Sequence, residues 1–488
     1  MVGRILEVLN LKSDQLFSVE SEKQFSYYEL ENCVNKMTNL IHENKWRKIV
    51  LCVKQGFWGY ATIISSYLAG ATFCVINSEL PRLRVESMLS EFIPDVIIAS
   101  ESCGWVEDYP HFKLDEEALE TVIRCNDIYI DNSPNKYAYV MFTSGSTGKP
   151  KGCKIIRESV SKVCNFALDT FPICKGMVYG QYVPLHFDMS LIDVFCGVIK
   201  SVTLIVFDTM ARKLRPANIV KKYKISFLNV TPQFVEILIR SDGLNYDFLS
   251  SLTAIRFGGD KVYKVKAELL FSILPNLEIF STYGATETTL FCMCQNIRKD
   301  TLEFYSKELL SIGKPITGWN FYLADVDERG IGEIVIFGSY IGDGYLGSEN
   351  GGFRNIIING IEQRAYFTGD YAKIDQGNLF FEGRRDCQVK INGQRGSLNE
   401  VENALIDMGI DEVAAVFKDN SIYCYYVNTK KISISELKEG MEERLPLYMV
   451  PSRMVEIAYM PYITNGKIDR AKLRKLESDN KNELYYSR

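Results

Sequence analysis

Short apolar runs alternate with longer amphipathic stretches over much of this chain. The runs IVLCV, TFCVI and DVIIA, between residues 49 and 99, have the length and composition of buried strands, and FWGYATIISSYLAG and ELPRLRVESMLSEF have helical spacing. The rhythm returns in residues 160–240, with strand-like VTLIVF and ISFLNV and helix-like VSKVCNFALDTF and TPQFVEILIR. Strands that alternate with helices build parallel sheets covered by helices. We therefore predict an α/β fold of layered, mostly parallel sheets.

The pattern changes twice towards the C-terminus. After about Ile316 glycine becomes dense, in DERGIGEIVIFGSYIGDGYLG and QGNLFFEGRR, which predicts short strands in an antiparallel or barrel-like region. Beyond Arg385 the order becomes strand, helix, strand, strand, helix, which is typical of a small α+β domain. We predict a large N-terminal domain over residues 1–385, which includes the barrel-like region, and a small mobile C-terminal domain over residues 386–488.

Charge and cysteine usage exclude several classes of protein. The chain has 56 basic and 61 acidic residues and a net charge of -5, whereas nucleic-acid binders usually carry a basic excess. Thirteen scattered cysteines and three histidines lack the spacing of a zinc site and fit a reducing compartment. No run of 18 apolar residues and no signal-peptide core is present. We expect a cytoplasmic protein that binds neither nucleic acid nor membrane.

A loop rich in glycine and hydroxyl residues follows the apolar run YAYVMF. Such a loop lets backbone N–H groups close on phosphate oxygens, and its lysines add positive charge. It is not a Walker A loop, because Pro150 stands where that motif needs Ser or Thr. On the residues alone, a solvated turn between a strand and a helix remains the alternative. The loop reads Thr143, Ser144, Gly145, Ser146, Thr147, Gly148, Lys149, Pro150, Lys151 and Gly152.

With this loop, the chain resembles the adenylate-forming superfamily of acyl-CoA synthetases, luciferases and the adenylation domains of nonribosomal peptide synthetases. The further matches follow in the expected order: FSYYEL, SYLAGATFCVI with LPRLRVESML, FDMS, TYGATE, GEIVIFGSYIGDGYLG, YFTGD, GRRDCQVKINGQR, LPLYMVP and TNGKIDR. One such match is weak evidence, but the ordered series along nearly the whole chain is specific. The resemblance implies the superfamily's two-domain fold and its use of ATP.

The resemblance assigns roles in nucleotide binding. Glu287 matches the Mg²⁺ ligand, and oxygen ligands suit this ion. Tyr283 matches the residue that stacks on adenine, and Asp370 the carboxylate that holds the ribose hydroxyls. The residues implied to bind ATP are Thr143, Ser144, Gly145, Ser146, Thr147, Gly148, Lys149, Lys151, Gly259, Asp260, Tyr283, Gly284, Thr286, Asp370 and Arg384.

The resemblance also implies catalytic and hinge residues in the C-terminal part. Lys467 matches the catalytic lysine, and Arg395 is the second residue of the implied catalytic set. Asp386 matches the hinge about which the small domain turns. Three departures are present: Ala285 in place of Pro, Asp260 in place of Glu, and 396–397 as Gly-Ser in place of an apolar-Glu pair. The third puts in doubt the contacts of the small domain during thioester formation.

Asp188 decides the expected substrate class. In aminoacyl-activating members this aspartate pairs with the substrate's α-ammonium, which needs a counter-charge when buried. Arg256 departs from the usual apolar residue, so it either binds an acidic or polar group of the substrate or turns away into a structural ion pair. The pocket residues implied by motif position are Asp188, Met189, Ile192, Asn229, Arg256, Gly258, Thr282, Leu290 and Phe291.

The compact chain looks most like freestanding amino-acid:carrier-protein ligases such as the D-alanine ligases. Too little sequence follows Arg470 for a carrier domain, so we expect the phosphopantetheine thiol on a separate carrier protein. Two alternatives stay open. One is an aryl- or acyl-acid ligase that uses coenzyme A or a carrier. The other is a catalytically inactive binding or regulatory protein, against which the intact Lys467, Glu287 and Asp370 argue.

Overall fold

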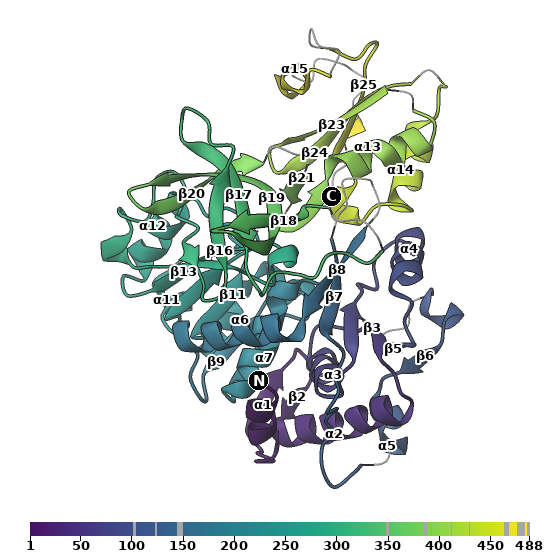
Figure 1. Cartoon of the computed structure of the whole chain (residues 1–488), viewed down its shortest axis with the longest axis vertical. Coiled ribbons are helices and arrows are strands. Elements are labelled where there is room, and N and C mark those ends of the chain that lie inside the picture. Colours follow the sequence, from purple (N-terminus) through teal and green to yellow (C-terminus); the bar gives the residue numbers. More distant parts are fainter. Residues whose placement is uncertain are drawn as a thin grey trace. The chain divides into compact units, whose positions relative to one another are not determined.

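The computed structural model describes the chain except residues 101–103, 123, 144–149, 348–350, 385–387, 392, 411, 429, 463–467, 476–483 and 486–488. Figure 1 shows the described elements. They divide into two compact units. The first comprises Met1–Ser78, Phe92–Met141 and Cys153–Gly383, and the second comprises Glu79–Glu91, Phe142–Gly152 and Arg384–Arg488.

A six-stranded sheet forms one layer of the fold, in the order β6-β5-β3-β4-β7-β8. The strands from β6 to β7 in this order are paired in parallel, and β4 and β5 are buried along their whole length because helices join them. The strands predicted from IVLCV, TFCVI and DVIIA are confirmed. The strands are β3 (Lys48–Cys52), β4 (Thr72–Val75), β5 (Val96–Ala99), β6 (His111–Lys113), β7 (Tyr137–Thr143) and β8 (Lys151–Ile156).

A nine-stranded sheet follows the order β15-β14-β13-β12-β11-β9-β10-β1-β2. The strands from β13 to β1 in this order are parallel, and the edge strands are antiparallel to their neighbours. The mostly parallel layers predicted from the sequence are therefore confirmed. The strands are β1 (Leu16–Val19), β2 (Gln24–Ser26), β9 (Val178–Gln181), β10 (Thr203–Val206), β11 (Phe227–Val230), β12 (Ala254–Phe257), β13 (Glu278–Tyr283), β14 (Met293–Ile297) and β15 (Lys314–Pro315).

Apolar helices supply the core between these sheets. The helix from Phe57 to Leu68 is apolar on nearly all sides and is almost wholly buried, as expected of a helix enclosed by other elements. One hydrophobic core cluster joins it to strands of both sheets. The helices of this unit are α1 (Val2–Leu9), α2 (Tyr27–Glu43), α3 (Phe57–Leu68), α5 (Glu116–Thr121), α6 (Arg157–Thr170), α7 (Leu191–Ile199), α8 (Met210–Leu214), α9 (Pro216–Tyr223), α10 (Gln233–Arg240), α11 (Tyr246–Leu249) and α12 (Lys264–Ile273).

The glycine-rich region forms a separate five-stranded antiparallel sheet, which confirms the antiparallel alternative. Asn359 and Gly360 join two of its strands with φ of 51° and 79°, the backbone that a tight hairpin turn requires. This explains why glycine becomes frequent here. The strands are β16 (Asn320–Ala324), β17 (Ile331–Phe337), β18 (Phe353–Ile358), β19 (Ile361–Asp375) and β20 (Asn378–Arg384).

The second unit is built around the C-terminal sheet β23-β24-β25-β26 and the hairpin β21-β22. Within it, Arg84 from α4 forms an ion pair of 2.8 Å with the buried Glu400. The predicted boundary residue, Asp386, lies outside the described residues. The elements are α4 (Arg82–Phe92), β21 (Gln388–Ile391), β22 (Gln394–Ser397), α13 (Leu398–Asp407), β23 (Glu412–Lys418), β24 (Ser421–Val427), α14 (Ile434–Glu442), β25 (Arg453–Glu456), α15 (Arg470–Lys475) and β26 (Leu484–Tyr485).

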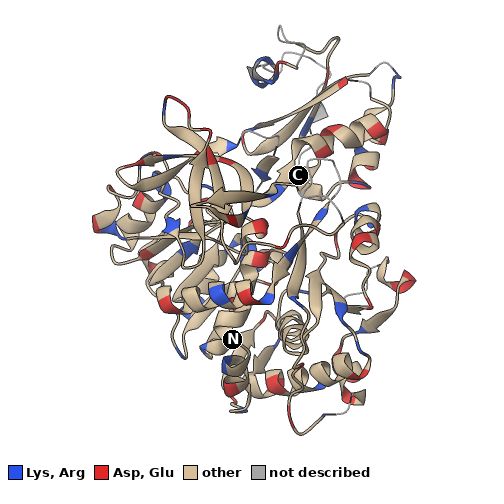
Figure 2. Cartoon of the chain, in the orientation of Figure 1, with Lys and Arg blue, Asp and Glu red and all other residues tan. Residues whose placement is uncertain are grey.

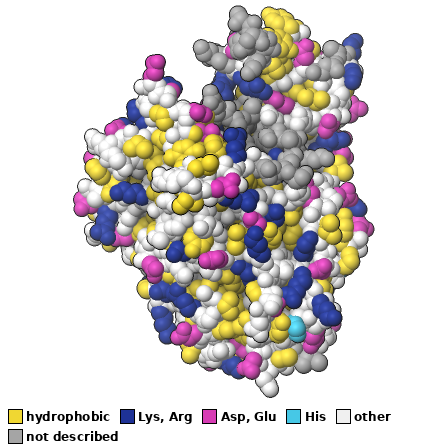
Figure 3. All heavy atoms as spheres, viewed as in Figure 1, with side chains coloured by type: hydrophobic (Ala, Val, Ile, Leu, Met, Phe, Trp, Pro, Cys, Tyr) yellow, Lys and Arg dark blue, Asp and Glu magenta, His cyan; other side chains and the backbone are white. Residues whose placement is uncertain are grey.

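Charged side chains of both signs are interspersed along the outer elements (Figure 2), and the face in Figure 3 mixes them with small hydrophobic areas. Within the described part of the chain, no helix combines the length and apolar character needed to cross a membrane.

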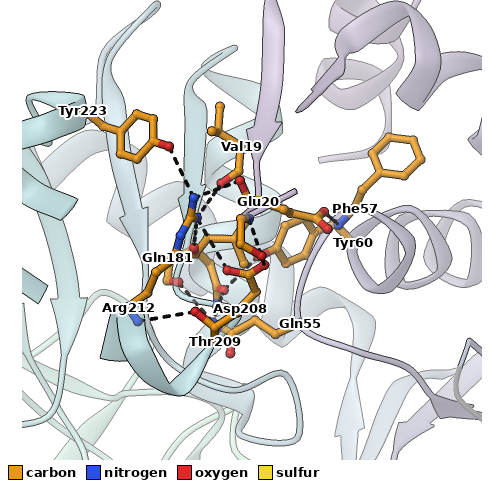
Figure 4. Close-up of polar contacts among 12 residues, drawn as sticks. Val19, Glu20, Gln55, Phe57, Tyr60, Gln181, Asp208, Thr209, Arg212 and Tyr223 are labelled. Atoms are coloured by element: carbon orange, nitrogen blue, oxygen red, sulfur yellow. Dashed lines mark hydrogen bonds and ion pairs between the residues drawn. The ribbon is translucent and has the colours of Figure 1, made fainter. Parts of the chain in front are cut away.

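A buried polar network connects β1, α3 and α8 in the first unit (Figure 4). The Arg212 guanidinium donates to the carbonyl oxygens of Val206 at 2.6 Å and of Glu20 at 2.8 Å. The Glu20 carboxylate accepts the backbone N–H of Phe57, the first residue of α3, at 2.6 Å. Burial raises the pKa of Glu20 above its ordinary value, although this hydrogen bond opposes the shift.

The raised pKa of Glu20 predicts a pH-dependent contribution to stability. The stability that this group supplies is fully present below its unfolded pKa of 4.5 and is lost as pH rises through the folded pKa. Glu20→Gln keeps an acceptor for the Phe57 N–H but cannot ionise. Relative to wild type, we expect the variant to gain stability as pH rises from about 4 to 8, measured by urea unfolding across that range. A difference that stays constant with pH would contradict the prediction.

Candidate functional site

Three neighbouring parallel strands bring predicted pocket residues to one edge of the nine-stranded sheet. Asn229 on β11 is directly opposite Arg256 on β12, and Arg256 is opposite Phe280 on β13. Because side chains alternate along a strand, Thr282 is on the same face as Phe280. These residues are near the carboxyl ends of their strands, where ligands bind in open α/β sheets.

Arg256 is the most unusual residue of this group. Its side chain is 1% exposed, its Nη1 donates to Asn229 Oδ1 at 2.7 Å, and its guanidinium is 4.6 Å from the ring centroid of Phe291. It forms no ion pair with any described residue, and its Nε has no hydrogen-bond partner. Burial lowers the pKa of the guanidinium, and nearby acidic groups oppose this shift.

Asn229 is held in place by the buried acid Asp193. The Asn229 side-chain amide donates to Asp193 Oδ1 at 2.7 Å and to the Met189 carbonyl oxygen at 3.1 Å. The Tyr179 hydroxyl donates to the same Asp193 oxygen at 2.7 Å. Both amide donations turn the Asn229 oxygen towards Arg256. Burial raises the pKa of Asp193 to about 7, against the hydrogen bonds that lower it.

Gly258, just after β12, lets neighbouring side chains pack close to its backbone. A Cβ built at this glycine would be 2.9 Å from Met189 Sδ, 3.1 Å from Thr282 Oγ1 and 3.4 Å from Arg256 Nη2. Three predicted pocket residues therefore converge on the point where this chain carries no side chain. Any larger residue would displace at least the methionine.

Asp188 begins a short 3-10 turn, Asp188–Ser190, before α7. Burial raises the pKa of Asp188 to about 6, while hydrogen bonds from Thr286 and the Met189 N–H, and the charge of Arg256, oppose the shift. Its Oδ2 is inaccessible to water and has no hydrogen-bond partner. This carboxylate oxygen is an unused acceptor beside the Arg256 group, which suits a cationic ligand.

Tyr283 and Asp370 form the next part of the site. Tyr283 ends β13, Asp370 is on β19, and the Tyr283 hydroxyl donates to Asp370 Oδ2 at 2.7 Å. Burial raises the pKa of Tyr283 well above its ordinary value, so the hydroxyl keeps its proton and acts as a donor. The two residues predicted to hold adenine and ribose are therefore in direct contact.

Glu287 is fully buried, and its Oε1 accepts the hydroxyl of Tyr345 at 2.7 Å. Among the residues with described positions, no cluster of three or more acidic, His or Cys side chains could hold a metal alone. Mg²⁺ usually binds one or two carboxylates together with substrate phosphates. A single carboxylate is therefore a fitting donor set for an ion that comes with a nucleotide.

The other predicted residues of the first unit surround these contacts. Ile192 on α7, and Leu290 and Phe291 before β14, belong to the main hydrophobic core cluster. Gly259 and Asp260 follow β12, and Gly284 follows β13 with Phe291 so close that a Cβ there would be 2.5 Å from the phenylalanine Cα.

Several predicted residues belong to the second unit or lie outside the described residues. Gln388 Oε1 accepts hydrogen bonds from Arg384 at 2.6 Å and from Arg395 at 2.8 Å. Thr143 ends β7 and Lys151 begins β8. The rest of the phosphate loop, the hinge aspartate and the catalytic lysine lie outside the described residues: Ser144, Gly145, Ser146, Thr147, Gly148, Lys149, Asp386 and Lys467.

Sequence reasoning missed residues that contact predicted site residues, among them Asp193, Tyr345 and Gln388. Asp193 had a visible signal, because it is an acid within the apolar run LIDVFCGVI, where an unpaired charge would be costly. Tyr345 is within the quoted motif GEIVIFGSYIGDGYLG, but its contact with Glu287 could not be foreseen because the two residues are far apart in the chain.

Comparison with known families gives one match, described as AMP-binding enzyme, over residues 8–346. The chain is 26% identical to tyrocidine synthase 3 of Brevibacillus parabrevis over 85% of its own length. It spans only 6% of that protein and 18% of bacitracin synthase 2 of Bacillus licheniformis. It is 26% identical to the D-alanine--D-alanyl carrier protein ligase of Staphylococcus epidermidis, covering 93% of this chain and 94% of the ligase.

Solved structures show the same fold. The adenylation domain AlmE of Vibrio cholerae, in complex with glycyl-adenosine-5'-phosphate, aligns with a TM-score of 0.82 at 21% identity, covering 97% of this chain and 96% of AlmE.

Proposed function

Because this chain belongs to the AMP-binding enzyme family, we propose that it is an ATP-dependent, AMP-forming ligase that activates an amino acid and transfers it to a carrier-protein thiol. The D-alanine--D-alanyl carrier protein ligases, which match nearly end to end, support this activity. The buried oxygen of Asp188 argues against the alternative of an aryl- or acyl-acid ligase.

The buried oxygen of Asp188 carries the choice of an amino acid. Asp188 Oδ2 has no hydrogen-bond partner and is shielded from water. A buried acceptor without a donor is costly, whereas an ammonium group would satisfy it with a charge-assisted hydrogen bond. A benzoate or a fatty acid brings no such donor. The side chain therefore favours a substrate with an amino group next to its reacting carboxylate.

The proposed reaction has two steps. A carboxylate oxygen of the amino acid attacks the α-phosphorus of ATP, the bond from that phosphorus to the bridging oxygen breaks, and pyrophosphate leaves. The thiol sulfur then attacks the acyl carbon of the aminoacyl-AMP, the carbon–oxygen bond to AMP breaks, and the thiol proton passes to solvent. The first step brings two anions together, so positive charge must be placed where they meet.

We assign the nucleotide to Tyr283, Asp370 and the loop that starts at Thr143. Glu287 would hold a Mg²⁺, which supplies positive charge against the phosphates when bound. Lys467 would place its ammonium between the attacking carboxylate and the α-phosphate, and Asp386 would be the hinge between domains 1–385 and 386–488. These roles rest on the motif resemblance. Tyr283, Glu287 and Asp370 are among the described residues, whereas Asp386 and Lys467 lie outside them.

The contact between Tyr283 and Asp370 predicts a modest effect on ATP use. Tyr283→Phe removes the hydroxyl that orients Asp370 but keeps the ring. Because the hydroxyl acts on ATP only through Asp370, we expect the KM for ATP to rise about 2- to 12-fold, equivalent to about 0.5–1.5 kcal/mol, the contribution of a typical intramolecular hydrogen bond. Exchange kinetics at varied ATP measure this, with the exposed Tyr246→Phe as the control. An unchanged KM would mean that the hydroxyl does not position the nucleotide-binding carboxylate.

The acceptor and the compartment complete the proposal. The described cysteines are free thiols, which supports a reducing compartment such as the cytoplasm. The experiment supplies ATP and a free amino acid together with one thiol acceptor: coenzyme A, pantetheine or a phosphopantetheinylated carrier protein. Adenylate formation and thioester formation are both followed by mass spectrometry. Preferential loading of a carrier protein supports the proposal. Loading of coenzyme A alone would favour the acyl-acid ligase, and no adenylate from any acid would favour an inactive binding protein.

A further inference from the structure

We propose that the amino acid activated at this site has an acidic side chain, whose carboxylate is bound by the guanidinium of Arg256. This inference rests on the proposed function, since it names the substrate class of the same pocket. It is carried by the unused hydrogen-bonding capacity of Arg256, by the residues that hold its guanidinium in place and by the incomplete neutralisation of its charge.

Arg256 has far more donors than the protein satisfies. Of its five N–H donors, the one hydrogen bond runs from Nη1 to Asn229, and Nε is buried without a partner. A guanidinium is the side chain best suited to bind a carboxylate, because its donors match the two carboxylate oxygens. A buried arginine with unused donors is costly, and a ligand carboxylate would remove that cost.

The neighbouring side chains hold the guanidinium in one orientation. Phe291 covers one face of it, and Asn229 fixes Nη1 because its own amide is held by Asp193 and Met189. Nη2 is 3.4 Å from the position that a Cβ at Gly258 would take, and it makes no hydrogen bond to a described residue. A guanidinium positioned in advance loses little conformational entropy when a ligand binds.

The charges around Arg256 leave it incompletely neutralised. Asp193 is the nearest acid in the network, but it reaches Arg256 through the Asn229 amide rather than by direct contact. Burial raises the pKa of Asp193 to about 7, so near neutral pH this acid carries only part of a charge. Asp188 also attracts Arg256, but it is the proposed partner of the substrate ammonium. An anionic substrate side chain supplies the remaining counter-charge.

Other side chains suit this pocket less well. A basic side chain would be repelled by Arg256, and an aliphatic one would leave the guanidinium desolvated without an acceptor. A carboxamide can accept a hydrogen bond but brings no charge. Glutamate compared with glutamine, and aspartate compared with asparagine, therefore isolate the charge at nearly constant shape.

The first test is amino-acid-dependent pyrophosphate exchange by the wild-type protein with those four amino acids, alanine and lysine. A hydrogen bond to a charged group corresponds to about 10- to 150-fold in kcat/KM, and we expect an acidic amino acid to exceed its amide by that factor. This test needs no variant, so it decides the question even if substitutions at Arg256 impair folding.

The second test is Arg256→Leu, with Arg298→Leu as a matched control, because Arg298 is an exposed arginine that pairs with Glu278. We expect Arg256→Leu to lower kcat/KM for the acidic amino acid about 10- to 150-fold and to change the value for its amide far less. The control should keep the wild-type preference.

The outcomes separate this inference from the proposed function. If the wild type activates neutral amino acids and shows no preference for acids over their amides, the acidic substrate is wrong and amino-acid activation stands. If Arg256→Leu lowers activity with acids and amides equally, Arg256 is a structural residue. If no amino acid supports exchange, the proposed function itself fails.

Discussion

Lys467→Ala should lower amino-acid-dependent pyrophosphate exchange by about 10²–10³-fold, because it removes the donor that we propose for the charge that develops in the transition state. The same variant should still transfer the acyl group from chemically supplied aminoacyl-AMP to a carrier thiol. The resemblance of the motif TNGKIDR implies this role for the lysine, and the proposed rotation about Asp386 would carry it away before thiol attack.

Both half-reactions must be measured on one preparation of this variant. Lys472→Ala, a change at an exposed lysine on α15, is a suitable control for removing a charge from the same region. Equal loss of exchange and transfer would contradict the alternation of the two domains. Unchanged exchange would remove Lys467 from the chemical step.

Asp188→Asn should lower kcat/KM for amino acids about 10- to 150-fold, the range expected for a hydrogen bond to a charged group. The variant keeps the shape of the side chain and its acceptor oxygen but loses the charge that pairs with the substrate ammonium. Asp169→Asn, at an exposed position on α6, is the matched control. A wild-type rate for Asp188→Asn would show that the ammonium binds elsewhere.

The pH dependence of kcat/KM is a second measurement that tests the role of Asp188. Burial raises the pKa to about 6, and only the ionised carboxylate attracts an ammonium group. Because kcat/KM reports ionisations of the free enzyme, it should fall in wild type as pH drops below about 6. In Asp188→Asn this dependence should be absent. The same acidic limb in both proteins would assign it to another group.

The fold could be predicted from the sequence where its signals are local. The helix FWGYATIISSYL is apolar on nearly all sides, and DVIIA is a short buried strand; both formed as expected because burial requires these patterns. The glycine-rich region was also predictable as antiparallel strands, since turns such as Asn359-Gly360 need positive φ. What the pattern left open was the order of the strands, which depends on contacts between distant segments.

The site was predictable only as far as its motifs extend. From the sequence alone, Arg256 could either contact the substrate or form a structural ion pair. The orientation of Arg256 depends on Asn229, whose amide is fixed in turn by Asp193 on another element. No local pattern records such a chain of hydrogen bonds. The same holds for Glu287 and Tyr345, which come from distant parts of the sequence.

The central claim is that this protein activates amino acids with ATP. The most direct test is pyrophosphate exchange by the wild-type protein, with all common amino acids compared against benzoates and fatty acids at equal concentration. We predict exchange that depends on an amino acid and exceeds that with any acid lacking an amino group. Faster exchange with a benzoate or a fatty acid than with every amino acid would contradict the claim.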